Sequence, residues 1–442
     1  MRKGLGNMSD WIIRGGAVLS GTVPVQGSKN AALPILAATL LVEEPVTLTN
    51  CPALRDVENM LRILEALGVT VVRGANALIV DSRTAENWVL PTALSGELRS
   101  SIFLLGSVLS RFGAADAPYP GGCEIGNRPI DLHLKGLRRL NAQIREQGGR
   151  IVCRGKLTGA VVDLEYPSVG ATENVMLAAC RAKGRTTIRN AACEPEIADL
   201  GAFLNACGFR VDGAGSPTVV IDGVETGHGT AFRIMPDRIV TGTYLLAAAI
   251  TGGDVTVTDT RPETVEPLLS KLTESGCAVT RGRGSVRVRA PERIRSVGFT
   301  ETRPYPGFPT DLQPLLFAVL SRANGTSVIV ENVFENRFRH AQELNKMGAK
   351  NRILDRTAIL TGAERLHGAS VTAHDLRGGA SLVLAGLFAE GETVIGHAER
   401  IERGYERMDE VIGSLGGSIA RKEENLDDEE KTRQTGAGEL PV

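Results

Sequence analysis

A short pattern recurs six times along the sequence, and each copy is typical of an amphipathic helix, then a glycine or small residue, then a strand. Glycine just beyond a helix accepts the left-handed backbone conformation that ends it, and β-branched residues then favour a strand. Successive copies lie 66 to 74 residues apart. This spacing predicts six similar units that share cores, since a unit of about 70 residues cannot bury its own faces well. The alternative, six ordinary βα segments of an ordinary α/β protein, is disfavoured by the regular spacing. The marker positions are Gly68, Ala142, Gly208, Gly276, Gly348 and Gly416.

A second set of six helices interleaves with the first, and these helices are apolar on nearly all faces. A helix that is hydrophobic all round is buried. Strands such as residues 219–222 and 285–289 instead alternate apolar and polar side chains, so one face meets water. Helices inside and sheets outside are the reverse of a doubly wound fold. We therefore expect an inside-out α/β protein with two lobes of three units, in which mixed sheets surround buried helices. The apolar helices begin near Asn30, Arg99, Val169, Arg238, Asp311 and Leu376.

Length and composition limit the possible functions. A chain of 442 residues is too long for one ordinary core, which agrees with two lobes. A net charge of -1 and an aromatic content of 4% argue against a nucleic-acid-binding protein. The apolar runs are too short to span a membrane, and no apolar stretch follows the first residues, so we expect no signal peptide. Seven cysteines without C-x-x-C or zinc spacing indicate a reduced, cytoplasmic protein with no metal site.

Positive charge gathers where the buried helices begin. Lys29, Arg99, Arg238 and Arg377 stand at four of the six starts, although helix N-termini usually favour acidic residues. Backbone N–H groups together with cationic side chains bind phosphate or carboxylate, so an anionic ligand would explain this bias. Alternatively, the cations pair with neighbouring carboxylates. For any one of these cations the two interpretations are equally well supported. Four cations at equivalent positions of a repeat favour the ligand, and so a cation-lined cleft between the lobes. The neighbouring carboxylates are Glu97, Asp237, Asp311 and Asp375.

Residues 119–129 form a glycine-rich stretch that carries one thiol, Cys123, and one arginine, Arg128. Prolines restrict the backbone at its ends, and glycines allow unusual backbone angles in its middle, so it cannot form a helix or a central strand. Taken alone, Cys123 is best interpreted as a free cysteine in a turn, because only a thiolate in an electropositive setting is reactive. Beside the cationic helix starts, it becomes a candidate acid on a loop over an anion site. The sequence contains no phosphate-binding P-loop, dinucleotide fingerprint or nucleophile elbow, and we expect no cofactor.

Nine segments of the sequence resemble the UDP-N-acetylglucosamine 1-carboxyvinyltransferase family, and the resemblance extends from about Trp11 to Ala420. The segments are 28–34 (SKNAALP), 98–102 (LRSSI), 120–133 (PGGCEIGNRPIDLH), 168–172 (SVGAT), 236–239 (PDRI), 308–311 (FPTD), 333–338 (VFENRF), 375–377 (DLR) and 403–407 (RGYER). The resemblance implies transfer of the enolpyruvyl group of phosphoenolpyruvate to the 3′-hydroxyl of UDP-N-acetylglucosamine. Phosphate is released, and the reaction is the first committed step of peptidoglycan synthesis. We expect these two small molecules as partners, with no nucleic acid, no membrane and no obligate protein partner.

The resemblance also implies a two-lobed inside-out α/β barrel whose chain crosses between lobes near Lys29 and near Asp237. One lobe, called the middle lobe below, spans residues 29–236. The other, called the terminal lobe, joins residues 1–28 to residues 237–420. Residues 421–442 contain an acidic run without a core pattern, and we expect them to form a disordered tail.

Roles for individual residues follow from the resemblance position by position. Cys123 would protonate the enolpyruvyl methylene and would be the residue that the epoxide antibiotic fosfomycin captures. Asp311 would take the proton from the attacking hydroxyl group. Asp375 and Arg377 would complete the cleft. The residues implied to bind phosphoenolpyruvate are Lys29, which also counts as catalytic, Asn30, Arg128 and Arg403, with Arg99 nearby. The residues implied to bind the UDP-sugar are Asn30, Arg99, Arg128, Pro129, Ile130, Asp131, Leu132, Ser168, Val169, Asp311 and Val333.

One position departs from the family pattern. Tyr166 stands two residues before Ser168, where the family usually has a lysine, so a tyrosine ring would have to stack or hydrogen-bond in place of a lysine contact to uridine. Two alternatives to the UDP-sugar enzyme remain. A 5-enolpyruvylshikimate-3-phosphate synthase shares the fold and the chemistry, but the Cys123 loop and residues 375–377 favour the UDP-sugar enzyme. A catalytically silent paralogue that binds UDP-sugar is the other, and no changed catalytic residue supports it.

Overall fold

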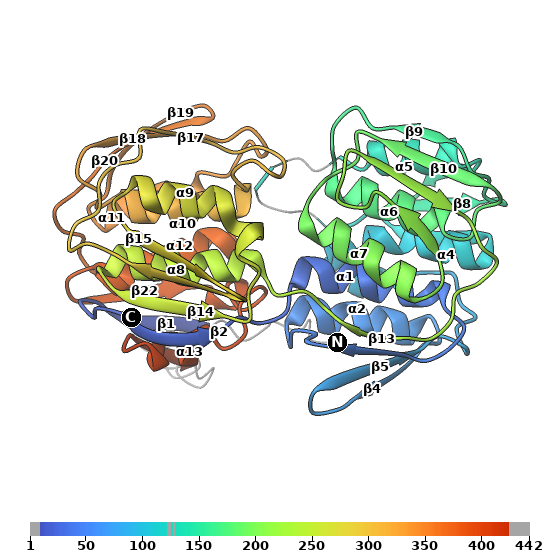
Figure 1. Cartoon of the computed structure of the whole chain (residues 1–442), viewed down its shortest axis with the longest axis horizontal. Coiled ribbons are helices and arrows are strands. Elements are labelled where there is room, and N and C mark those ends of the chain that lie inside the picture. Colours follow the sequence, from blue (N-terminus) through green and yellow to red (C-terminus); the bar gives the residue numbers. More distant parts are fainter. Residues whose placement is uncertain (1–8, 122–124, 127–128, 424–442) are drawn as a thin grey trace, which may run out of the picture.

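The computed structural model describes residues 9–121, 125–126 and 129–423. Their buried apolar side chains form two separate clusters, which lie side by side as two lobes (Figure 1). One cluster extends from Ala31 to Met235. The other combines residues 11–25 with residues 239–415. Cys123 and Arg128 lie outside the described residues.

Six helices fill the lobe interiors of the described chain (Figure 1). They are α1 (Lys29–Ala38), α4 (Leu104–Phe112) and α6 (Val169–Ala179) in the middle lobe, and α8 (Arg238–Thr251), α10 (Gln313–Leu320) and α12 (Leu376–Phe388) in the terminal lobe. Every residue of α8 and α10 is buried. Helix α10 packs against both α8 and α12, and α4 packs against α6. The expectation that these helices are buried is therefore confirmed, although the last turn of α4 is only partly buried.

A second helix in each unit packs nearer the surface. These helices are α2 (Arg55–Ala66), α5 (Asp131–Arg139), α7 (Pro195–Ala206), α9 (Glu266–Glu274), α11 (Arg339–Lys346) and α13 (Met408–Ser414). The glycine that follows five of them takes a φ between 86° and 95°, as the repeat predicts. After α5 the left-handed position is filled by Asn141, with a φ of 72°, one residue before Ala142. Asparagine tolerates this conformation better than most residues, so the unit without glycine still ends its helix in the same way. Shorter helical segments are α3 (Thr92–Glu97), η1 (Thr39–Leu41), η2 (Arg99–Phe103), η3 (Pro262–Val265), η4 (Thr310–Leu312) and η5 (Ala398–Arg400).

Among the described residues, three sheets cover the middle lobe. Their strand orders are β13-β3-β5-β4, β6-β8-β7 and β11-β12-β10-β9. The strands are β3 (Val46–Thr49), β4 (Thr70–Arg73), β5 (Ala77–Asp81), β6 (Ala114–Pro118), β7 (Gln143–Gln147), β8 (Arg150–Arg154), β9 (Val161–Asp163), β10 (Arg185–Arg189), β11 (Arg210–Asp212), β12 (Thr218–Asp222) and β13 (Ala231–Arg233). Strand β12 alternates buried and more exposed side chains, as expected for a sheet with one face toward water.

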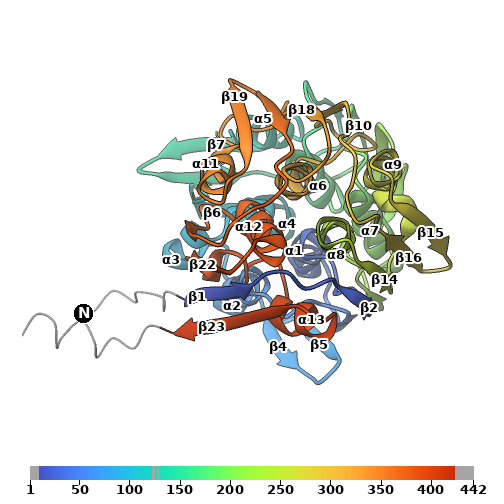
Figure 2. The ribbon, with the colours of Figure 1, turned by 90° about the vertical axis from the view of Figure 1, so that its left-hand side faces the viewer.

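In the part of the chain that the structure describes, three further sheets cover the terminal lobe (Figure 2). Their strand orders are β21-β22-β1-β23, β15-β16-β14-β2 and β17-β18-β20-β19. The strands are β1 (Ser9–Arg14), β2 (Ser20–Pro24), β14 (Asp254–Thr258), β15 (Ala278–Gly282), β16 (Ser285–Arg289), β17 (Phe299–Glu301), β18 (Thr326–Val330), β19 (Lys350–Leu354), β20 (Thr357–Thr361), β21 (Ser370–Thr372), β22 (Glu392–Gly396) and β23 (Ser418–Glu423). The sheets are mixed, since β14 runs parallel to β2 and antiparallel to β16. Within the described residues each sheet is open, so the barrel-like arrangement comes from three units around shared helices.

The chain passes between the two apolar clusters twice, and the two crossings lie against each other. Gly27 and Pro236 form an antiparallel bridge. Ser28 N donates to the Met235 carbonyl oxygen at 2.8 Å, and Asp237 N donates to the Gln26 carbonyl oxygen at 2.9 Å. We propose that the lobe boundaries fall inside these segments, at 28/29 and 236/237.

The C-terminal boundary expected from the sequence needs a correction. Strand β23 continues to Glu423, three residues beyond the expected end of the terminal lobe at Ala420. Its register pairs Arg421 with Trp11 of β1. The Arg421 guanidinium also forms ion pairs with Asp409 and Glu402. Residues 421–423, which composition alone assigned to the tail, are therefore held on the terminal lobe by backbone pairing and by these carboxylates.

Candidate active site

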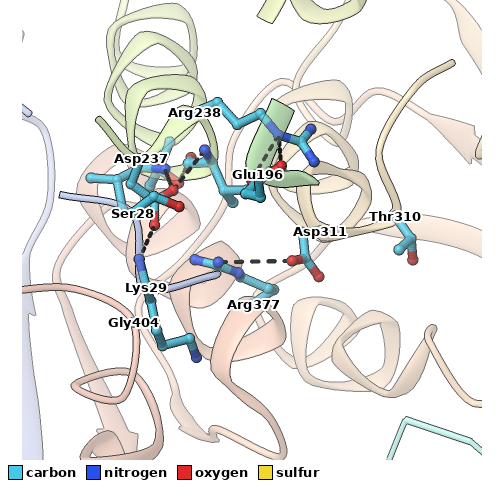
Figure 3. A network of polar contacts seen from close by, with 12 residues as sticks. Ser28, Lys29, Glu196, Asp237, Arg238, Thr310, Asp311, Arg377 and Gly404 are labelled. Carbon is cyan, nitrogen blue, oxygen red and sulfur yellow. Dashed lines mark hydrogen bonds and ion pairs between the residues drawn. The ribbon is translucent and has the colours of Figure 1, made fainter. Parts of the chain in front are cut away.

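The starts of α1 and α8, one inner helix from each lobe, meet at the crossings. Ser28 Oγ accepts a hydrogen bond from Ala31 N and caps α1, and Ser168 Oγ caps α6 in the same way. The Asp237 carboxylate caps α8, with Oδ1 accepting from two backbone N–H groups. Its Oδ2 accepts a 3.4 Å bond from Lys29 N (Figure 3). One buried carboxylate therefore contacts the helix starts of both lobes.

Lys29 and Arg403, from different lobes, share a single carboxylate. Lys29 Nζ lies 3.1 Å from Asp56 Oδ2. Arg403 Nε donates to Asp56 Oδ1 at 2.8 Å, and its Nη2 donates to Oδ2 at 3.3 Å. The side chains of Lys29 and Asp56 are 10% and 6% exposed. Two cations held on one carboxylate leave an excess of one positive charge at the start of α1, which favours an anionic ligand there.

Burial and charge both act on the ionisation of this group. Burial lowers the pKa of Lys29, and the nearby Arg377 and Arg403 lower it further, against the opposing effect of Asp56. Burial would raise the pKa of Asp56, but Lys29 and Arg403 outweigh it and the pKa lies below its usual value. Asp56 is thus an ionised group that holds both cations in position.

Asp311 lies between two buried arginines of the terminal lobe. Arg337 Nη2 donates to Asp311 Oδ1 at 2.8 Å. Arg377 Nη2 lies 3.8 Å from Asp311 Oδ2, and Arg337 Nη1 lies 3.6 Å from Asp375 Oδ1. Asp375 also caps α12, because its Oδ1 accepts from Arg377 N and Gly378 N. The two arginines and two carboxylates balance in charge, so this group differs from the cationic one around Lys29.

The remaining cationic helix starts have different surroundings. Arg238 donates from Nε to both carboxylate oxygens of Glu196, at 3.0 and 3.2 Å, which links α8 to the middle lobe. Arg99 begins η2. Burial, with a smaller contribution from Arg99, lowers the pKa of the buried His133 to about 3. Lys29 and Arg238 pair with Asp56 and Glu196, which the sequence did not single out. The side-chain contact between Arg377 and Asp311, at 3.8 Å, does join residues that were expected to pair.

The expected UDP-sugar residues come from several elements. Asn30 follows Lys29 on α1, Ser168 and Val169 start α6, and Val333 lies in the terminal lobe, where its N–H donates to Glu331 Oε1 at 2.8 Å. A pocket of about 670 Å³ is lined in part by Pro129, Ile130 and Asp131. Leu132 follows on α5.

The glycine-rich loop reaches the opposite lobe. The Ile125 carbonyl oxygen accepts a 3.1 Å hydrogen bond from Asn336 N of the terminal lobe. Ile125 is buried, and Gly126 lies against Glu335. Cys123 and Arg128 belong to this loop but lie outside the described residues. Their predicted roles as acid and phosphate ligand stay predictions.

Sequence reasoning missed several residues of the site. Asp56 and Glu196 stand in the first turns of α2 and α7, where acidic residues are common because they complement the helix dipole. Nothing in the sequence separates them from ordinary residues of that kind. Arg337 and Tyr405 do lie in segments that carry the family resemblance. The Tyr405 hydroxyl is 3.0 Å from Thr243 Oγ1, and the Arg377 guanidinium lies over the Tyr405 ring.

Comparison with known proteins places this geometry in a family. Residues 13–412 match the family model described as EPSP synthase (3-phosphoshikimate 1-carboxyvinyltransferase). The chain belongs to this family. It is 49% identical over 415 residues to UDP-N-acetylglucosamine 1-carboxyvinyltransferase 2 of Caldanaerobacter subterraneus, covering 94% of the chain and 100% of that protein. It is 48% identical to UDP-N-acetylglucosamine 1-carboxyvinyltransferase 1 of Carboxydothermus hydrogenoformans, over 94% of the chain and 98% of that protein. It is 45% identical to UDP-N-acetylglucosamine 1-carboxyvinyltransferase of Magnetococcus marinus, over 94% of the chain and 99% of that protein. Among the family's members, the chain therefore groups with the UDP-sugar enzymes that the sequence resembles.

Solved structures of other family members share the fold. The enolpyruvyl transferase NikO from Streptomyces tendae superposes with a TM-score of 0.85 at 26% identity, covering 95% of the chain and 100% of that protein. EPSP synthase from Acinetobacter baumannii gives a TM-score of 0.74 at 19% identity, over 94% of the chain and 100% of that protein. The expected two-lobed α/β architecture is confirmed. In the ranges that the structure describes, none of the helices has the length and apolar character needed to cross a membrane.

Proposed function

We propose that this protein transfers the enolpyruvyl group from phosphoenolpyruvate to the 3′-hydroxyl of UDP-N-acetylglucosamine and releases phosphate. The observation that carries the proposal is the Lys29–Asp56–Arg403 group, a cationic site joined across the lobes, in a chain whose curated relatives bear that enzyme's name. The location that fits these substrates is the cytoplasm, and no protein partner is required for the chemistry.

Phosphoenolpyruvate presents a phosphate and a carboxylate, and the site offers several cations to receive them. Lys29 and Arg403 supply two charges that Asp56 orients in advance, so binding does not have to order them. Asn30 supplies an amide beside Lys29, and Arg128 is proposed as a further phosphate ligand. Arg99 lies at the start of the next inner helical segment and adds positive charge on the side of the UDP-sugar.

The proposed chemistry needs an acid and a base on different lobes. Cys123 donates a proton to the methylene carbon of phosphoenolpyruvate, and the 3′-oxygen bonds to the neighbouring carbon. Asp311 takes the proton of that hydroxyl group. Arg337, at 2.8 Å, fixes the orientation of the Asp311 carboxylate. The resulting phospholactoyl ketal then loses a proton from its new methyl group and expels phosphate, which restores the carbon–carbon double bond.

The UDP-sugar is proposed to lie along the middle-lobe side of the site. Ser168 and Val169 at the start of α6, and residues 129–132 at the start of α5, offer backbone and side-chain contacts to it. Val333 and Asp311 would approach the sugar from the terminal lobe. Tyr166 is 44% exposed. Burial, followed by the charges of Glu194 and Glu331, raises its pKa, so its ring stays neutral and available to stack on a base.

The test is a steady-state assay of purified protein with phosphoenolpyruvate and either of two acceptors. Phosphate release with UDP-N-acetylglucosamine, and none with shikimate-3-phosphate, is the expected result. Asp311→Asn serves as the inactive comparison. Release with shikimate-3-phosphate alone would reject the assignment, and no release with either acceptor would favour a silent binding protein.

A further inference from the structure

A second cationic pocket lies beside the chain crossing, and its lining includes none of the residues assigned to the candidate active site. Its volume is about 580 Å³. The middle lobe contributes the end of β13 and the crossing segment, and the terminal lobe contributes the end of β14 and the tip of the β15–β16 hairpin. The lining residues are Arg233, Ile234, Pro236, Thr258, Asp259, Thr260, Arg261, Arg283, Gly284 and Ser285.

Three arginines line this pocket against one acidic residue, Asp259, so the lining residues carry an excess of two positive charges. Arg233 Nη2 lies 3.9 Å from Asp259 Oδ2, which is too long for a hydrogen bond. Arg261 Nη2 lies 3.7 Å from Asp199 Oδ1, also too long. Arg283 forms no ion pair with any residue that the structure describes.

Neighbouring arginines on the same hairpin are engaged quite differently. Arg281 holds Glu266 through a contact of 2.6 Å, and Arg287 holds Asp254 at 2.6 Å. Each of these two arginines has a carboxylate partner of its own. Arg283, at the turn between them, has none among the described residues and lines the pocket instead. Arg233 and Arg261 of this pocket therefore have longer ion-pair contacts than Arg281 and Arg287 of the neighbouring hairpin strands.

We propose that this pocket binds a small polyanion that carries at least two phosphate groups. Guanidinium groups form paired hydrogen bonds with phosphate, and three of them surround a space larger than one phosphate. The volume falls within the range of small-molecule sites. The Ser285 hydroxyl group adds a polar contact at the pocket wall.

The two loose ion pairs give the pocket a connection to lobe movement. Arg233 and Asp259 lie on different lobes, and so do Arg261 and Asp199. Asp199 is buried on α7, and its Oδ2 accepts a 3.1 Å hydrogen bond from Met235 N in the crossing segment. A polyanion that draws in Arg233 and Arg261 bridges both lobes directly. On the proposed function, whose chemistry needs both lobes, such a ligand changes turnover without entering the active site.

The test is isothermal titration calorimetry of the full-length protein with inorganic pyrophosphate at low ionic strength. Arg283→Ala removes a pocket guanidinium that has no ion-pair partner among the described residues, and Arg281→Ala is the matched control on the same hairpin. Lys29→Ala reports on pyrophosphate bound at the candidate active site. Circular dichroism verifies that each variant is folded.

Binding that persists in Arg281→Ala and Lys29→Ala but weakens about tenfold or more in Arg283→Ala supports the proposal, since a hydrogen bond to a charged group is worth that much. Binding that is lost in Lys29→Ala and unchanged in Arg283→Ala overturns it, as does an absence of binding to the wild-type protein at millimolar pyrophosphate. Because binding is measured without substrates, failure here leaves the proposed enzymatic function untouched, and failure of the transferase assay leaves this result untouched.

Discussion

Replacing Asp56 with asparagine tests whether one carboxylate organises the cationic site. Asp56 accepts hydrogen bonds from Lys29 and Arg403 at 2.8 to 3.3 Å, and its side chain is only 6% exposed. Asparagine has nearly the same shape but carries no charge, and its amide nitrogen faces one of the cations. Removing one partner of a buried ion pair costs about 3–5 kcal/mol, and we expect roughly 3 kcal/mol because one acceptor oxygen remains.

The loss should appear in two independent assays. The thermal midpoint should fall by roughly 5–10 °C at pH 7. The kcat/KM for phosphoenolpyruvate should fall about a hundredfold, equivalent to ~2.7 kcal/mol, because Lys29 and Arg403 are no longer held in position. Glu58→Gln is the matched control, since Glu58 stands on the same helix and pairs at 2.8 Å with Arg73, with both side chains largely exposed. An exposed pair of this kind contributes at most about 1 kcal/mol.

The pH dependence of the same variant gives a further check. The pKa of Asp56 is lowered in the folded protein, so its stabilisation is present above the ordinary carboxyl pKa of ~3.9. It is lost as the pH falls below that value. The difference in thermal midpoint between wild type and Asp56→Asn should therefore narrow from pH 7 toward pH 3. The reasoning fails if Asp56→Asn unfolds within 1 °C of Glu58→Gln and keeps the wild-type kcat/KM.

Three other predictions follow from the structure. Burial raises the pKa of Asp199 to about 6, so the ionised carboxylate destabilises the fold above that pH, and protonation toward pH 4 removes this destabilisation. The free energy of unfolding of Asp199→Asn relative to wild type should therefore rise by roughly 1–3 kcal/mol between pH 4 and pH 7. A difference in urea unfolding that does not change with pH would contradict this prediction. Asp311→Asn should lower kcat by about 10²–10⁴ with little change in the affinity for UDP-N-acetylglucosamine, and a wild-type rate would remove Asp311 from the role of base. Gly68→Ala should destabilise the fold by roughly 1–2 kcal/mol, because Gly68 has a φ of 95° and an added Cβ would lie 2.8 Å from the Thr84 carbonyl oxygen. Gly413→Ala is the control and should be neutral or stabilising, because no atom lies near the added Cβ. Equal thermal midpoints for the two variants would refute the argument.

The architecture could be predicted because its signals are local. The glycines that end the outer helices repeat at similar intervals, and the inner helices are apolar on nearly all faces. Both features report on a few neighbouring residues and need no knowledge of distant ones. Even Ala142, the one repeat position without glycine, was correctly assigned to a helix end, although Asn141 carries the left-handed backbone there.

The site was predicted less completely because it depends on pairing between distant segments. The cations at the helix starts were recognised from their equivalent places in the repeat. Their partners Asp56 and Glu196 were not, because each is an acidic first-turn residue of the kind found on many surface helices. Only the folded chain brings Asp56 within 3 Å of Arg403, which lies 347 residues away in sequence. The continuation of β23 to Glu423 was missed for the same reason, because it depends on pairing with β1 at the other end of the described chain.

The adjacent crossings also set an order for folding during synthesis. The middle lobe is one continuous stretch, and it is complete once the ribosome has passed the second crossing, so it can fold while the rest of the chain is still being made. Strands β1 and β2 emerge first, yet β2 must wait for β14, and β1 must wait for β22 and β23. Until then their backbone edges lack partners in the finished sheets. Strands β1 and β2 therefore remain exposed to chaperones and to aggregation until their partner strands have been made. In the folded protein β1 lies inside its sheet, and β2 lies at the edge of its sheet beside β14.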